Sequence, residues 1–346
     1  MVRATKSVKF FRLSLFAFLF ALLALIFNAY VRYADAGVRC PDWPGCYGKV
    51  FAPETPKEHA EAREAQETSE AIAKPAPKKT PWREVVQRYI SGALGLFLIA
   101  LVQLGWQLKK RKRNQQWIIP LATMLFSFGM VFVSLATYDL QFKPLVMQIQ
   151  FLGNMVTVAL LWWIVLREQR FWRPLAQSKI VGGVRPRALI TLALAGMTAV
   201  FGGWSMVNYA AFACPDFPTC QGSYWPPMDV VEGLVMWRDV GLEFDAKSLN
   251  LAGATAIHFA HRVSALVTLL YAGWLSLYVL RTGVEGAFCR YGFLVLLVLL
   301  SAVVLGVMQV LMHMPVVVAV SHSVAGALLV LSLVTLYHVV RPPRPA

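Results

Sequence analysis

Charged residues are scarce in this chain: Asp, Glu, Lys and Arg make up 15% of its 346 residues, against roughly 25% in soluble domains. Apolar residues reach 58% and come in long runs, which the core of a water-soluble protein does not require. The scarcity of charge therefore excludes a soluble domain and indicates a chain that crosses a membrane several times.

Eight apolar runs are long enough, at about 20 residues, to cross a bilayer as helices. They cover approximately residues 12–32, 88–108, 117–137, 146–166, 188–208, 255–280, 291–312 and 316–339. The first run could instead be a cleaved signal peptide, because Ala34, Asp35 and Ala36 imitate a cleavage site. Its length exceeds the usual signal core, and its loss would leave unequal halves. We therefore predict an all-α integral membrane protein with eight transmembrane helices in contact with lipid.

Basic residues are almost absent from the short loops of one face, where Lys143 stands alone. The opposite face carries the basic tail before the first helix, the run 109–113 and the segment 167–187. Since Lys and Arg stay on the cytoplasmic side, we expect both termini in the cytoplasm. The long loops, about 33–87 and 209–254, then lie outside, as in a protein of the bacterial inner membrane. This bias accounts for most of the net charge of +15, which therefore does not indicate nucleic-acid binding.

The segment CPDWPGC at 40–46 recurs as CPDFPTC at 214–220, which is 174 positions later. An offset of about half the length indicates a tandem duplication. With four helices in each half, both halves enter the membrane in the same direction and are related by a pseudo-twofold axis along the membrane normal. We predict one four-helix bundle over 1–175 and a second over 176–346. The sequence leaves a homo-oligomeric state open.

Cysteine is scarce as well, with five in the chain. In an oxidising compartment the repeated pairs predict the disulfides Cys40–Cys46 and Cys214–Cys220. The alternative is two turns with free thiols. No histidine accompanies either pair nearby, which argues against a metal site there, and Cys289 is expected to be a reduced cytoplasmic thiol.

Two of the six histidines fall inside predicted helices at similar depth, His261 and His322. Ionisable residues inside a membrane are costly and are functional candidates by default. Two imidazoles that face each other across a bundle suit axial ligation of haem iron, whereas a lone histidine is more often structural. The remaining histidines at 59, 313 and 338 are interpreted as surface or interfacial residues.

Two neighbours of His261 are further candidates. His258 lies three residues earlier on the same helical face, as a supporting partner, a haem propionate contact or an alternative ligand. Arg262 follows directly and is a candidate to neutralise a propionate near the interface.

The repeat offset places glutamines in the first half where the second half has histidines. His261 corresponds to Gln87, which Arg88 follows, and His258 corresponds to Glu84. His322 corresponds to Gln150 by local alignment, because QFLGN at 150–154 matches HSVAG at 322–326, six residues after Pro144 and seven after Pro315 respectively. Glutamine is a poor iron ligand but a good hydrogen-bonding group, so the first half keeps the position of the site without its metal chemistry.

The CPDWPGC loop, the stretch NYAAFACPDFPTCQGSYWPPMD at 208–229, the motif AIHFAHR at 256–262 and His322 resemble the haem A synthase family. The resemblance covers essentially the whole chain. It implies two four-helix bundles, haem b held by His261 and His322, and haem O as the substrate. It also implies a catalytic role for Glu84 in oxidising a haem O methyl group to a formyl group for cytochrome oxidase assembly. A haem O donor enzyme and oxidase assembly proteins are the implied partners.

The chain departs from the family at the two first-half histidines, which are Gln87 and Gln150 here. Two functions follow. One is a divergent haem A synthase that holds haem O without histidine ligands. The other is a non-catalytic haem b membrane cytochrome or haem-handling assembly factor.

Overall fold

A computed structural model of the chain describes residues 2–34, 82–109, 117–136, 144–168, 175, 178–237, 249–282 and 286–342. In these ranges the chain is helical apart from turns and one isolated bridge between Cys220 and Ser223, so the all-α prediction is confirmed. The long helices are α1 (Val2–Ala34), α3 (Trp82–Lys109), α4 (Ile118–Ala136), α5 (Pro144–Glu168), α6 (Lys179–Val207), α8 (Leu251–Arg281), α9 (Gly286–Leu311) and α10 (Val316–Val340). Two short elements, η2 (Ala210–Ala213) and α7 (Val230–Gly233), lie in the loop between α6 and α8.

Among the described residues, seven helices are long and apolar enough to cross a membrane. The remaining long helix, α4, is apolar only over the shorter stretch Ile118–Ser134. It occupies the place of the predicted third crossing at 117–137. The chain is therefore an integral membrane protein, and its eighth crossing stays a prediction.

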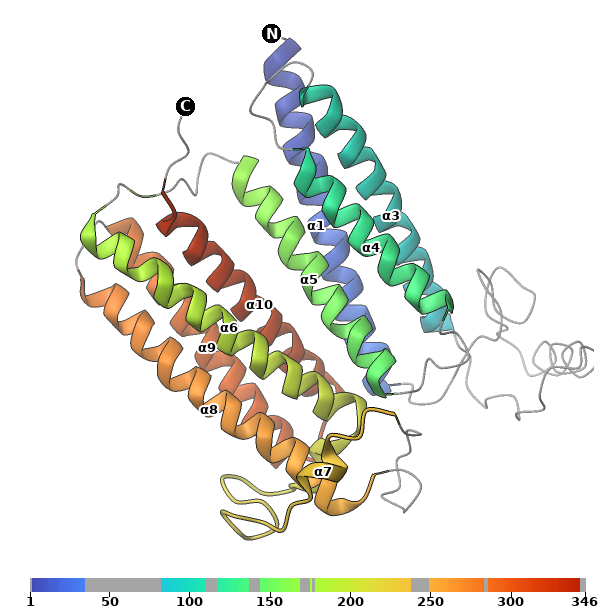
Figure 1. Cartoon of the computed structure of the whole chain (residues 1–346), viewed down its shortest axis with the longest axis vertical. Coiled ribbons are helices and arrows are strands. Elements are labelled where there is room, and N and C mark those ends of the chain that lie inside the picture. The colour runs from blue at the N-terminus through green and yellow to red at the C-terminus, as the bar shows by residue number, and fades with distance from the viewer. Residues whose placement is uncertain are drawn as a thin grey trace, which may run out of the picture.

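The long helices fall into two groups by their contacts (Figure 1). In the first group α1 packs against α3 and α5, and α4 packs against the same two helices. In the second group α6 and α9 each pack against both α8 and α10. The groups meet where α10 contacts α1 and α5, and where α5 contacts α6. Each group has its own apolar core, and α10 adds Ala327 and Leu331 to the core of the first.

Local sequence signals account for the helix starts. Ser178, Asp229 and Asn250 each accept a hydrogen bond from a backbone N–H of the following first turn. Pro144 begins α5 and Pro315 precedes α10, where the missing proline N–H costs no helical bond.

Several polar side chains within the apolar helices are hydrogen-bonded to the backbone of their own helix. Ser14, Thr157 and Thr335 donate to the carbonyl four residues earlier. The indole Nε1 of Trp162 on α5 donates to Oγ1 of Thr335 on α10 at 2.9 Å, which ties the two helix groups together.

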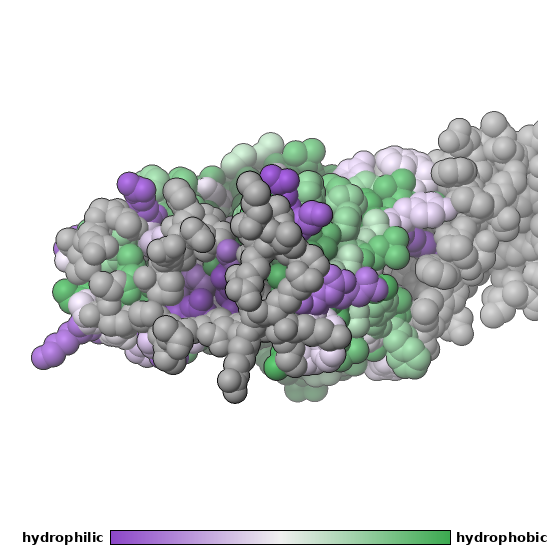
Figure 2. Space-filling view, turned by 90° about the horizontal axis from the view of Figure 1, so that it is seen from above, coloured by the Kyte–Doolittle hydropathy of each residue, from purple (hydrophilic) through white to green (hydrophobic). Residues whose placement is uncertain are grey.

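The first turn of α1 and the last turn of α10 lie at the same end of the bundle as the last turns of α5 and α8 and the first turn of α6 (Figure 1). Seen from that end, hydrophilic residues gather on the end face and hydrophobic residues cover the flanks (Figure 2). This is the surface expected of a bundle whose sides face lipid.

Candidate functional site

The two histidines singled out by the sequence lie opposite each other in the second helix group, with their rings nearly perpendicular. His261 comes from α8 and His322 from α10, with ring centres 6.2 Å apart and ring planes at 74°. Two imidazoles that share one metal ion at about 2 Å each place their ring centres about 6 Å apart. The spacing of this pair therefore fits two axial ligands of one haem iron.

The ring nitrogens of the pair are held differently. Nδ1 of His322 lies 2.9 Å from the carbonyl oxygen of Ala302 on α9. Since a carbonyl only accepts, Nδ1 carries the proton and Nε2 keeps its lone pair, as a metal ligand requires. His261 faces the backbone of Thr198 on α6 beyond hydrogen-bonding geometry, so its buried Nδ1 makes no hydrogen bond.

His258 lies one turn before His261 on α8 and is 5% exposed. It faces the backbone of Ala211 in η2, and its buried Nδ1 has no partner. In the described part of the chain, no three His, Cys, Asp or Glu side chains are grouped so as to hold a metal ion. The donors that face each other here are two histidines. An iron whose other ligands come from a porphyrin therefore suits this pair better than a metal ion held by protein side chains alone.

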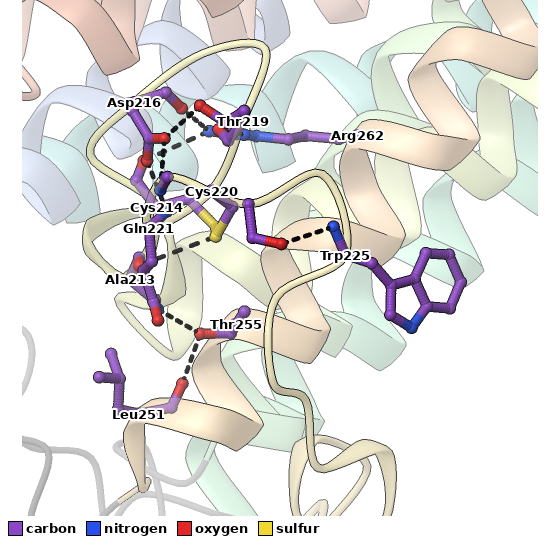
Figure 3. The surroundings of a disulfide bond; sticks show 12 residues. Ala213, Cys214, Asp216, Thr219, Cys220, Gln221, Trp225, Leu251, Thr255 and Arg262 are labelled. Atoms are coloured by element: carbon purple, nitrogen blue, oxygen red, sulfur yellow. Dashed lines mark hydrogen bonds between the residues drawn. A yellow bond between two sulfur atoms is a disulfide. The ribbon is translucent and has the colours of Figure 1, made fainter.

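Arg262 points away from the helix group and holds the loop between η2 and α7. Its Nη1 donates to the carbonyl of Thr219 at 2.7 Å, and its Nη2 donates to the carbonyls of Asp216 at 2.8 Å and Cys214 at 3.3 Å (Figure 3). The guanidinium also lies over the ring of Phe217, 5.6 Å from its centre. One side chain of α8 thus fixes the loop that precedes α7.

This loop is closed by the predicted disulfide Cys214–Cys220. The two cysteines are 0% and 1% exposed, so the bond is buried beneath its own loop. Gln221 joins the loop to α8, because its Nε2 donates both to the Ala213 carbonyl and to Thr255 Oγ1, each at 2.9 Å (Figure 3). The disulfide loop is therefore anchored at two points of α8.

Asp216 organises the inside of the loop. Its carboxylate accepts from the Thr219 hydroxyl, from the backbone N–H of Gln221 at 2.6 Å and from that of Gly222 at 3.0 Å. The pKa of Asp216 is lowered, chiefly by the Thr219 hydrogen bond; burial opposes this shift, and the backbone N–H groups of Gly222 and Gln221 lower the pKa further. The charged form of this carboxylate thus stabilises the turn.

Comparison with known proteins settles the family. The family model of the COX15-CtaA cytochrome oxidase assembly protein matches residues 11–334. The chain belongs to this family. It is also 32% identical over 319 residues to the haem A synthase of Shewanella oneidensis, with 92% of each protein covered. The chain is accordingly a haem A synthase-like membrane protein of cytochrome oxidase assembly.

The first-half positions of this family member lie in the other helix group. Gln87 and Arg88 are half-buried residues of α3, and Glu84 lies in the first turn of that helix. Gln150 on α5 directs its Nε2 toward Ser134 Oγ on α4, at 3.4 Å. Cys40, Cys46 and His59 lie outside the described residues, so the predicted Cys40–Cys46 disulfide stays a prediction.

The other histidines and the free cysteine have ordinary surroundings. His338 is 1% exposed and lies edge-on against Trp163, with ring centres 5.3 Å apart, so it is buried rather than interfacial. His313 lies in the turn between α9 and α10 with a φ of 59°. Cys289 is a free thiol whose Sγ lies 3.7 Å from the Leu280 carbonyl oxygen.

Sequence reasoning missed three residues that shape the site, namely Asp216, Gly202 and Gly306. The repeated motif was the available signal for Asp216, because both copies carry an Asp at this position, Asp42 in the first and Asp216 in the second. The glycines beneath the histidine rings, Gly202 and Gly306, carried no signal in hydropathy or spacing.

Proposed function

We propose that the chain is a haem A synthase in which His261 and His322 hold haem b and the first helix group receives haem O. The observation that carries the proposal is the ring separation of 6.2 Å, together with the Nδ1 contact of His322 that leaves Nε2 available. Family membership and the relative from Shewanella oneidensis support the reaction class. Bound haem b supplies one-electron transfer.

The chain's own residues have separable roles in this proposal. His261 and His322 would hold haem b between α8 and α10. His258, buried with an unpartnered Nδ1, supplies a polar contact for a propionate one turn nearer the outer end of α8. Glu84 acts on the substrate as an acid–base group, as the family resemblance implies.

The proposal includes eight crossings, arranged as two four-helix bundles at 1–175 and 176–346 related by a pseudo-twofold axis. The two closed groups of helix contacts and the apolar character of α4 support this arrangement. Both termini are then cytoplasmic, and the Cys214–Cys220 loop lies outside in an oxidising compartment. An enzyme that delivers haem O and other oxidase assembly proteins are the proposed partners.

A non-catalytic haem b cytochrome or assembly factor is the second candidate. It is favoured by Gln150, whose side chain lies against Ser134 instead of presenting an imidazole. In that case the first helix group would serve a partner or a different ligand.

Haem typing of the purified protein tests the haem b site. We expect low-spin haem b in the natural protein, and we expect His261→Ala and His322→Ala each to lose the low-spin absorption bands. His313→Asn is the matched control, because Asn tolerates the positive φ at this position and His313 lies in the turn between α9 and α10, outside both ligand-bearing helices. Retention of the natural spectrum by both Ala variants would overturn the ligand assignment.

Haem A formation from supplied haem O tests the reaction. We expect the natural protein to form haem A and Glu84→Gln to form none while keeping its haem b. A natural protein that carries haem b alone and forms no haem A would support the second candidate instead.

A further inference from the structure

Each histidine ring of the pair lies directly on a glycine of a neighbouring helix. A Cβ added to Gly202 of α6 would stand 2.8 Å from Cε1 and 3.3 Å from Nδ1 of His261. A Cβ added to Gly306 of α9 would stand 2.9 Å from Cε1 and 3.2 Å from Nδ1 of His322. Carbon atoms in good contact are about 3.5–4.0 Å apart, so neither position admits a side chain while the ring stays in place.

The two contacts follow the same pattern. Gly306 comes one helical turn after Ala302, whose carbonyl oxygen meets Nδ1 of His322. Gly202 comes one turn after Thr198, whose backbone His261 faces. We call each combination of a backbone carbonyl and a glycine one turn later an imidazole seat.

Glycine is unfavourable inside a helix, by about 1 kcal/mol relative to alanine, so a helical glycine needs a reason. Two other glycines of the same helix group, Gly196 and Gly326, do not approach a histidine ring. A Cβ at Gly196 of α6 or at Gly326 of α10 would meet nothing within 4 Å. Close approach to a histidine ring is thus particular to Gly202 and Gly306 among these four.

The repeat shows what stands at the first of these positions in the other half. Residues 27–30, FNAY, correspond to residues 201–204, FGGW, so that Asn28 takes the place of Gly202. Asn28 thus places a side chain where Gly202 has none, and its Oδ1 accepts a hydrogen bond from Nε of Arg32 at 2.6 Å.

The first-half counterpart of Gly306 is identified by the contact that its neighbour makes. Gln150 is the counterpart of His322, and it lies against Ser134 of α4 as His322 lies against Gly306 of α9. Both seats of the first half are therefore filled by polar side chains, and both of its histidines are glutamines.

From these contacts we infer that histidine and seat form one unit, in which Gly202 and Gly306 are positioning residues that set the direction of the iron-binding imidazoles. The inference rests on the proposed haem b site. It adds that the first half has lost imidazole ligation twice over, in its histidines and in its seats. Any porphyrin bound there is held by contacts other than histidine ligation.

Alanine substitutions in the purified full-length protein test the inference. Gly202→Ala and Gly306→Ala should each lose the low-spin absorption bands or shift the midpoint potential of the haem. Gly196→Ala and Gly326→Ala are matched controls on the same helix group, and both should keep the natural spectrum and potential. If the two seat variants bind haem with natural spectrum, stoichiometry and potential, the inference is wrong.

A double-mutant cycle on haem-free protein separates a displaced ring from general misfolding. Gly202→Ala should lower the melting temperature in the natural background and raise it in the His261→Ala background, where no ring meets the new methyl group and alanine is the better helix former. An equal loss in both backgrounds would overturn the inference, because Gly202 would then serve the helix and not the histidine. The cycle needs no bound haem, so it gives a result even if the proposed haem site fails.

Discussion

The three hydrogen bonds of Arg262 give the most direct quantitative prediction. The Cys214–Cys220 bond is almost fully buried, so a reductant reaches it only when the loop opens. Opening breaks the bonds from Arg262 to the carbonyls of Thr219 and Asp216, at 2.7 and 2.8 Å, and the longer bond to Cys214. We therefore expect Arg262→Met to accelerate reduction of this disulfide.

The magnitude follows from the two shorter bonds. A hydrogen bond from a charged donor contributes about 1.5–3 kcal/mol, and we take the lower figure because this guanidinium is partly exposed. Together they stabilise the closed loop by about 3 kcal/mol, which corresponds to about a hundredfold change in the opening equilibrium. Arg262→Lys should fall between the natural protein and Arg262→Met, since one ammonium cannot reproduce the planar fork.

The assay is the rate of phosphine reduction of the disulfide, followed by mass spectrometry of alkylated peptides. Arg187→Met is the matched control, because Arg187 stacks on Tyr278 at 4.8 Å and has no contact with the loop in its described interactions. An unchanged reduction rate in Arg262→Met would refute the clamp. A changed haem spectrum alongside that unchanged rate would return Arg262 to the role of propionate contact expected from the sequence.

Three further predictions concern the loops and the first half. The folded pKa of Asp216 lies below its ordinary value of 3.8, so the carboxylate stabilises the folded loop fully above that value and loses this effect as the pH falls through the folded pKa. Phosphine reduction of the disulfide should therefore accelerate below about pH 4. Asp216→Asn should make the reduction rate less dependent on pH. Non-reduced peptide mapping should recover Cys40 linked to Cys46, and recovery of both as alkylated thiols would contradict the repeat. The double variant Gln87→His with Gln150→His should gain no second haem by haem-to-chain ratio, whereas the same variant with both first-half seats changed to glycine should gain one; a second haem in the double variant alone would show that seats are dispensable.

Much of the fold was available from the sequence because hydropathy and charge act locally along the chain. The long apolar runs predicted helices that the structure contains, and the repeated CPDFPTC segment predicted the Cys214–Cys220 disulfide. The placement of His261 and His322 within long helices followed from the apolar runs around them. Family membership followed from the same motifs and is confirmed by comparison.

Tertiary structure alone decided how these residues are held. Gly202 and Gly306 lie far from their histidines in sequence, and only the packing of α6 against α8 and of α9 against α10 brings each ring onto its glycine. The same holds for Arg262, which the sequence suggested for a propionate and the structure places against loop carbonyls. Hydropathy patterns record which face of a helix avoids water. They do not record which backbone lies opposite a side chain, because that depends on how closely two helices approach each other.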